Sequence, residues 1–195
     1  MDNILDHTVL LLSRLQGIGT RSARRILFDL MKKKELLLEP LILSLDNVAK
    51  NIKTCQQCFN LDITDPCNIC SDSTRDKQTI CVVEDISSLW AIENSKSYNG
   101  LYFVLGGNIS AQKNQSPQNL NIDLLLEHIK SSSITEVIIA TSATMEGQIT
   151  SHYIKDQIDP KITLTMLAQG IPIGGEIDYL DDITLSTAIK LRKVL

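Results

Sequence analysis

The chain contains few aromatic residues, which limits what it can bind. Phenylalanine, tyrosine and tryptophan together make up 4% of its 195 residues. Proteins that hold single-stranded nucleic acid usually stack the bases on aromatic rings, so we expect no base-stacking platform here. The chain also lacks an apolar stretch near the ~20 residues that a membrane helix needs. Its N-terminus, with Asp2 and Asp6, is not typical of a signal peptide.

Charge is distributed unevenly along the chain. The net charge is −4, yet the first 34 residues carry seven basic side chains against three acidic ones, or +4, which leaves −8 for the remainder. A basic head on an acidic body can hold phosphate locally while the rest repels it. We therefore expect weak DNA binding by one copy and stronger binding when several heads act together.

Two cysteine pairs are the strongest chemical signal. Cys55 and Cys58 form one C-x-x-C pair, and Cys67 and Cys70 form the other, with eight residues between the pairs. Four thiolates at this spacing predict a tetrahedral zinc site, and four protein ligands make it structural. Duplicated pairs favour metal binding over thiol exchange. Thiolates kept as ligands suit a reducing compartment, so we expect a cytoplasmic protein. The fifth cysteine, Cys81, lies among apolar residues and is expected to be a buried small hydrophobe.

A glycine-containing turn separates two helical patterns near the N-terminus. Gly17 and Gly19 allow a sharp turn, and Thr20 is a reasonable N-cap for the second helix. Backbone N–H groups at that N-terminus would face outward and bind phosphate whatever the base sequence. Arg21 and Arg25, one helical turn apart, would reinforce this site. The alternative is an ordinary helix connection that uses glycine as a C-cap.

The pattern changes to alternating strands and helices from about residue 80. This alternation predicts a parallel sheet covered by helices on both faces. The expected strands are residues 80–84, 101–105, 136–140 and 162–167, and the helices between and after them are 86–94, 120–130, 145–158 and 184–193. A further helix is expected over 36–51, across Pro40, and a polar, mobile loop over 111–121.

Glu84 stands at the end of the first strand of this sheet, where parallel folds place their sites. A magnesium site would need companion aspartates at a later strand end. The chain contains no Asp-x-Asp, and Glu146 is the nearby carboxylate. The P-loop pattern is missing as well. We therefore expect no catalytic residues. The histidines show no ligand pattern and are expected on the surface or in packing: His7, His128 and His152.

The order of these motifs resembles that of the bacterial RecR family of recombination mediators. The resemblance covers nearly the whole chain and is carried by residues 15–25, 67–70, 80–84, 140–147 and 170–176. It implies a multidomain α/β protein. The expected parts are helix–hairpin–helix helices over 1–53, a four-cysteine zinc module over 54–76, a Toprim domain with a Rossmann-like parallel sheet over 77–170, and a C-terminal segment with oligomer contacts over 171–195.

The resemblance also implies a function. It indicates a non-catalytic DNA clamp, a ring-like homodimer or homotetramer that acts with RecO, and in many bacteria RecF, to load the RecA recombinase on single-stranded gaps. By resemblance, Gly17, Gly19, Arg21 and Arg25 belong to the DNA-binding hairpin, and Glu84 contacts RecO.

Two other functions stay open beside this one. One is a magnesium-dependent Toprim nuclease or primase-like enzyme that uses Glu84 with Glu146. The other is a sequence-specific regulator built on the zinc module. Against it, the chain lacks a recognition helix rich in base-reading side chains. The chain departs from the family pattern in the loop after Gly107, in Ser142-Ala143-Thr144, and at Met166, which replaces a basic residue.

Overall fold

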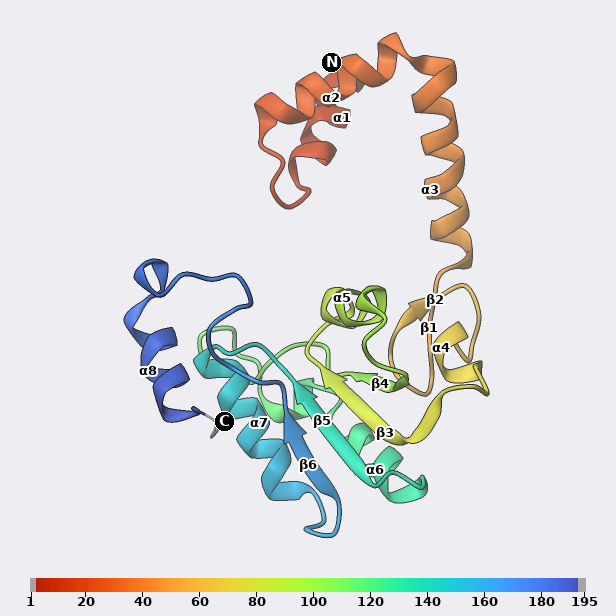
Figure 1. Ribbon diagram of the computed structural model, residues 1–195. Coiled ribbons are helices and arrows are strands. Elements are labelled where there is room, and N and C mark those ends of the chain that lie inside the picture. The colour runs from red at the N-terminus through yellow and green to blue at the C-terminus, as the bar shows by residue number, and fades with distance from the viewer. Residues whose placement is uncertain (1–2, 193–195) are drawn as a thin grey trace. The chain divides into compact units, whose positions relative to one another are not determined.

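The computed structural model describes residues 3–192, and the chain divides into two compact units between Ile52 and Lys53 (Figure 1). The first unit is helical, and the second contains the cysteine module and the sheet. Among the described residues, no helix has the length and apolar character needed to cross a bilayer.

The first unit consists of three α-helices and a π-helical turn. They are α1 (Ile4–Ser13), α2 (Thr20–Lys32), the turn η1 (Lys34–Leu38) and α3 (Glu39–Asn51). The prediction of Thr20 as N-cap is wrong, because Gly19 has extended dihedral angles and α2 starts at Thr20. The helix expected across Pro40 is present, but it divides into the π-helical turn η1 and α3. Pro40 lies in the first turn of α3, where its missing N–H costs no hydrogen bond.

The core of the first unit is small. Only Val9, Ala23 and Leu27 are buried among its described apolar residues, with Leu5, Leu12 and Ile18 packed against them. Many large apolar side chains stay exposed instead, and on α3 those of Leu41, Ile42, Leu43, Leu45 and Val48 are 42–65% exposed. This unit therefore leaves much of its apolar surface uncovered within one chain.

The second unit is built on a four-stranded parallel sheet, which confirms the predicted fold class. Its strands are β3 (Asp76–Val83), β4 (Gly100–Val104), β5 (Glu136–Ala140) and β6 (Thr163–Met166), in the spatial order β4-β3-β5-β6. All three strand pairs are parallel, which requires a crossover between successive strands. Helices α5 (Ile86–Ser95), α6 (Ile122–Ser131) and α7 (Met145–Gln157) supply these crossovers.

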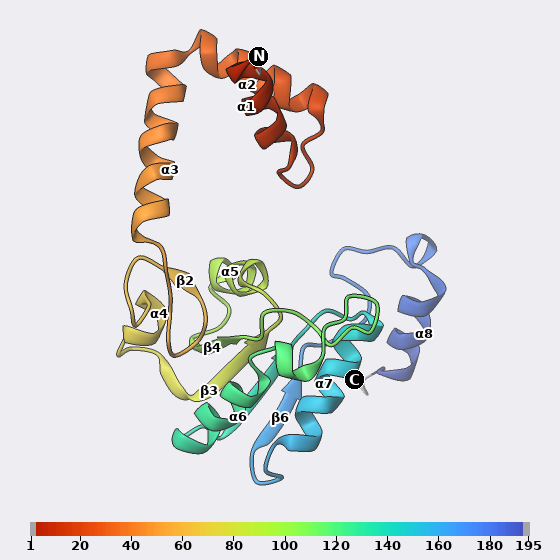
Figure 2. The ribbon, with the colours of Figure 1, turned by 180° about the vertical axis from the view of Figure 1, so that it is seen from behind.

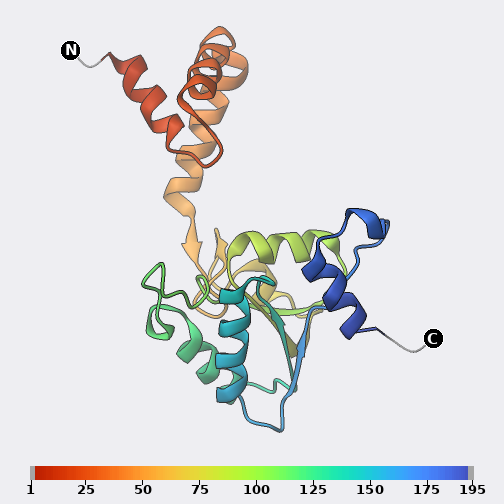
Figure 3. The same cartoon turned by 90° about the vertical axis from the view of Figure 1, so that its left-hand side faces the viewer.

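Alternate residues of β3 enter two separate cores. Ile80 and Val82 pack in the core that contains side chains of α6 and α7, whereas Cys81 and Val83 pack in the core that contains Leu89 of α5. The sheet is therefore covered on both faces, with α6 and α7 together on one of them (Figure 3). Cys81 is 2% exposed, so it is the buried hydrophobe that the sequence predicts.

The longer connections contain more order than the sequence suggests. The loop after β4 is joined to itself by a bridge between Ser110 and Gln115 and includes a 3-10 turn, η2 (Pro117–Asn119). After β6 the chain forms a second such turn, η3 (Ile177–Tyr179), and the helix α8 (Asp182–Lys190), seen from behind in Figure 2. The expected end of this helix at residue 193 lies outside the described residues. Large apolar side chains are exposed in this segment as well, among them Ile173, Ile177, Tyr179 and Ile183.

Candidate functional site

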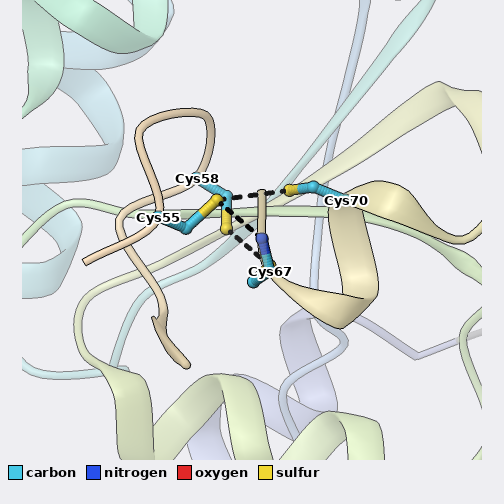
Figure 4. A group of neighbouring side chains, drawn as sticks. All are labelled: Cys55, Cys58, Cys67 and Cys70. Atoms are coloured by element: carbon cyan, nitrogen blue, oxygen red, sulfur yellow. Dashed lines mark hydrogen bonds between the residues drawn. The ribbon is translucent and has the colours of Figure 1, made fainter. Parts of the chain in front are cut away.

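The four paired cysteines converge on one point, as the spacing predicts (Figure 4). Their Sγ atoms all lie within 4.8 Å of one another. The Cys58–Cys67 and Cys55–Cys70 sulfurs are separated by 3.5 and 3.9 Å. Tetrahedral zinc with Zn–S bonds near 2.3 Å places its sulfurs about 3.8 Å apart, whereas a disulfide needs about 2.05 Å. The donor set therefore fits one zinc ion.

The backbone around the cysteines forms a compact knuckle, defined here as residues 53–71. The antiparallel strands β1 (Lys53–Thr54) and β2 (Leu61–Asp62) flank the first pair, and the short helix α4 (Asn68–Ser71) follows Cys67. Two carboxylates tie the loops together, since Asp65 accepts from the Gln56 amide at 3.0 Å and Asp62 from the Asn68 amide at 2.8 Å. The ligands are thus positioned by local bonds.

Hydrogen bonds between neighbouring thiols shift the pKa values of Cys58 and Cys67 in opposite directions. The pKa of the Cys67 thiol is lowered because Cys58, and then Cys70, hydrogen-bond to it. The pKa of the Cys58 thiol is raised, first by its bond to Cys67. The amide of Cys67 also donates to Cys55 Sγ at 3.4 Å. Four thiolates therefore need a cation between them, and bound zinc supplies that charge and cross-links the knuckle.

The predicted hairpin turn is open on its outer side. Gly17 has φ +77°, a left-handed conformation that favours glycine. A Cβ added at Gly17 or Gly19 would meet nothing within 4 Å, and no side chain caps the N-terminus of α2. The first N–H groups of α2 are accordingly unshielded, as an anion site requires.

Exposed arginines flank this helix start. Arg21 and Arg25 are both exposed and are separated by one helical turn. Arg24 is exposed too and, three residues after Arg21, lies on the same side of α2. Arg24 is not among the predicted site residues, although its spacing from Arg21 gave the signal. No ion pair joins these arginines to the described acidic side chains.

Glu84 follows β3 directly and is held by donors from two other strand ends. Its Oε2 accepts from the Ser142 amide, after β5, at 3.0 Å and from the side-chain amide of Asn108, after β4. Asn108 also donates to Ser142 Oγ at 3.3 Å. Glu84 thereby joins three loops at the carboxyl edge of the sheet.

A cavity of about 390 Å³ lies at this edge, and we call it the Glu84 pocket. It is lined by Glu84, Asp85, Gly107, Asn108, Ser110, Lys113, Gln115, Ser142, Thr144 and Glu146. Gly147 allows α7 to start close beside this pocket, because a Cβ at that position would overlap the Ser142 carbonyl oxygen. Among the described residues, the cysteines are the one group of three or more metal-binding side chains that converge, so no carboxylate cage forms around Glu84.

Family models match most of the second unit. The Toprim domain model matches residues 78–168, the RecR four-cysteine zinc finger domain model matches residues 52–72, and the RecR C-terminal model matches residues 170–193. The zinc finger match contains all four converging cysteines. Together with their geometry, it assigns one structural zinc ion to the knuckle.

Curated relatives extend the similarity over nearly the full length. Proteins named Recombination protein RecR are 48% identical over 189 residues in Bartonella bacilliformis, covering 96% of this chain and 94% of the relative. The identity is 45% over 191 residues in Paramagnetospirillum magneticum, covering 97% of each chain. It is 46% over 183 residues in Sphingopyxis alaskensis, covering 93% and 92%. Because identity at this level spans both units, the chain belongs to the RecR family of recombination proteins.

Proposed function

We propose that the protein is a non-catalytic recombination mediator that binds DNA as a ring-like clamp. In this role it acts with RecO, and with RecF where the host has it, to help load RecA on single-stranded gaps. The observation that carries the proposal is the open N-terminus of α2 beside exposed Arg21 and Arg25. The naming of its relatives as recombination proteins supports a role in DNA repair.

The hairpin is the proposed DNA surface. Backbone N–H groups at Gly19 and the first turn of α2 can bind a phosphate without reading bases. Arg21 and Arg25 add positive charge beside them, and the left-handed Gly17 sets the angle of the turn. Binding is therefore expected on any sequence, in duplex and gapped DNA alike.

Assembly of several copies is part of the proposal. A single +4 head on a chain of net charge −4 is a weak DNA ligand. Exposed apolar side chains on α3 and in the segment after β6 supply surface that a homodimer or homotetramer would cover. A ring of copies would then present several heads to one DNA molecule and gain affinity by avidity.

Glu84 is the proposed contact for RecO. Among residues 3–192, the donors to its carboxylate both bond to Oε2, and the carboxylate lines the Glu84 pocket, which leaves Oε1 for a partner. Neutral donors fix the carboxylate while leaving its charge in place, which suits recognition of a basic group.

The division of the chain completes the proposal. The helix–hairpin–helix region takes residues 1–53, the zinc module 54–76, the Toprim domain 77–170 and the oligomer-contact segment 171–195. Four zinc-bound thiolates favour a reducing compartment, so we place the protein in the bacterial cytoplasm, near the nucleoid.

The test is incubation of the zinc-loaded protein with labelled gapped duplex and Mg²⁺, followed by native and denaturing gels in parallel. The clamp predicts retarded DNA with intact strands. Cut or extended strands that disappear in Glu84→Ala would replace the proposal with the nuclease or primase-like alternative. Intact DNA that is not retarded, under conditions where the protein is assembled, would remove the hairpin as a DNA surface.

A further inference from the structure

The outer edge of β4 is covered by the zinc knuckle. β4 is an edge strand of the sheet, and such edges expose unpaired backbone groups unless something covers them. Here the Val104 amide donates to the Cys58 carbonyl oxygen at 2.9 Å. At the other end of β4, the Arg75 guanidinium donates to the Gly100 carbonyl oxygen at 3.1 Å and pairs with Glu93 of α5. A zinc ligand thus supplies a backbone partner for the sheet.

Side chains strengthen this junction. Phe59, next to Cys58, packs edge-on against Phe103 of β4 with ring centroids 5.3 Å apart. Phe59 has φ +62°, a left-handed conformation that is unfavourable for a non-glycine residue. Its amide donates to the Cys55 carbonyl oxygen at 3.0 Å, so the metal-ligand turn holds this conformation. Phe59 also contacts both cores of the sheet.

The end of β4 leads directly to the Glu84 pocket. After Val104, the Leu105 amide donates to the Val83 carbonyl oxygen at 2.9 Å, and Gly106 and Gly107 turn the chain with φ of +87° and +142°. Asn108 follows and donates to Glu84. Only three residues, 105–107, therefore separate the strand end held by Cys58 from the side chain that holds Glu84.

We propose that zinc in the knuckle sets the geometry of the Glu84 pocket. In this view the metal fixes Cys58 and Phe59, these fix the end of β4, and Asn108 acts as the positioning residue that orients the Glu84 carboxylate. Any effect of this geometry on partner binding rests on the proposed role of Glu84 as a partner contact. The coupling between the knuckle and the pocket does not depend on that role.

A competing set of contacts makes the proposal testable. The loop that carries Asn108 is also held from α7, because the Ile109 amide donates to Thr150 Oγ1 at 2.9 Å. Thr150 is fully buried and donates to the Glu146 carbonyl oxygen at 2.7 Å. If these bonds alone hold the loop, removal of zinc leaves Asn108 and Glu84 where they are.

The experiment compares the full chain with zinc and after chelation, using two readouts. The first is the carboxyl ¹³C signal of Glu84 in glutamate-labelled protein, assigned with Glu84→Gln, with the exposed Glu176 as internal control. The second is hydrogen exchange in residues 104–108, with residues 145–157 as reference. The zinc-loaded Asn108→Ala protein gives the Glu84 signal expected when the positioning bond is lost.

The proposal expects chelation to move the Glu84 signal in the same direction as Asn108→Ala. It also expects exchange in residues 104–108 to increase about tenfold, with little change in residues 145–157. An unchanged Glu84 signal after chelation would overturn it. So would an equal increase of exchange in both segments, because zinc would then hold the whole domain and not this path.

A second variant covers the case in which the chelated protein unfolds. Phe59→Ala keeps all four cysteines and removes the ring that packs on Phe103. With zinc content equal to that of the wild type, it is expected to move the Glu84 signal part of the way towards that of Asn108→Ala. A zinc-loaded Phe59→Ala protein with a wild-type Glu84 signal would refute the coupling. DNA binding is not involved in either readout, so the outcome is independent of the clamp proposal.

Discussion

The zinc knuckle and the hairpin turn are both short loop motifs, but the knuckle buries its functional groups and the hairpin exposes them to solvent. In the knuckle, Cys55, Cys58 and Cys67 are at most 1% exposed, and backbone amides pair with sulfur and carboxylate acceptors around them. In the hairpin, the space beside Gly17 and Gly19 is empty and no side chain caps α2. One motif pairs the backbone amides around its ligands internally, and the other leaves the first amides of its helix open to solvent.

This difference distinguishes a structural site from a recognition site. A closed site is complete within the chain, so its loss should change stability first. An open site gains its partners from a ligand, so its loss should change binding and leave the fold intact. The experiments below test this distinction, beginning with the largest expected effect.

Replacement of a zinc ligand should have the largest effect. Cys67→Ser is expected to lose zinc and at least about 4 kcal/mol of unfolding free energy, as is typical of a lost structural metal. For a chain of this size, that lowers the melting temperature by roughly 10 °C or more. Zinc content and thermal unfolding measure both consequences. Cys81→Ala, which also removes a buried thiol, should keep the zinc. A Cys67→Ser protein without metal that melts like the wild type would show that the knuckle is not structural.

Removal of the two hairpin arginines should weaken DNA binding without lowering stability. Arg21→Ala combined with Arg25→Ala is expected to reduce affinity roughly tenfold on every sequence. Each lost phosphate contact makes the fall of log affinity with log salt concentration less steep by about 0.9. Loss of both contacts should therefore reduce the magnitude of this slope by about 1.8. Fluorescence anisotropy at several salt concentrations measures both, with the exposed Lys161→Ala as control. An unchanged slope would place the DNA surface elsewhere.

The two hairpin glycines give a matched pair with a smaller effect. Gly17→Ala forces a side chain into a left-handed conformation at a cost of about 1 kcal/mol, whereas Gly19 has φ −81° and accepts alanine without strain. We expect Gly17→Ala to weaken DNA binding several-fold and Gly19→Ala to have little effect. Equal losses in both variants would mean that space at the turn, and not its conformation, determines binding.

The sequence predicted the knuckle well because its chemistry depends on local spacing. Cys55, Cys58, Cys67 and Cys70 converge as two pairs of thiolates must if they share one ion. The parallel sheet was predictable for a similar reason, since its strands are short apolar runs separated by helical patterns. Both depend on residues close together in the chain.

Features that depend on distant contacts were not predictable. The bonds from Asn108 and Ser142 to Glu84 join residues 24 and 58 positions apart, and nothing in the local pattern indicates them. The same holds for Val104 and Cys58, which make the knuckle part of the sheet domain. Helix boundaries near Gly19 and Pro40 were misplaced because the backbone there is set by dihedral preferences that composition alone does not decide.

The burial of His128 indicates whether the knuckle packs firmly against the core of the sheet. Its ring lies 6.0 Å from that of Phe103, which in turn contacts Phe59 of the knuckle. Burial lowers the pKa of His128 below its ordinary value near 6.5. The unfolded chain therefore binds a proton more readily than the folded one. Stability from this group is complete above about pH 6.5 and is lost as the pH falls below it.

The pH-dependent stability that His128 contributes should be the smallest of the four predicted effects. A comparison of the wild type with a variant isolates it. Thermal unfolding of wild type and His128→Gln between pH 5 and 7.5 should show a weaker loss of stability at low pH in the variant. Protonation of the zinc ligands affects both proteins alike and cancels in the difference. His152→Gln, at an exposed position, should follow the wild type. If the stability of His128→Gln has the same pH dependence as that of the wild type, the contact from Phe59 through Phe103 to α6 is loose in solution. The knuckle would then resemble the hairpin, because its outer face would be open to solvent.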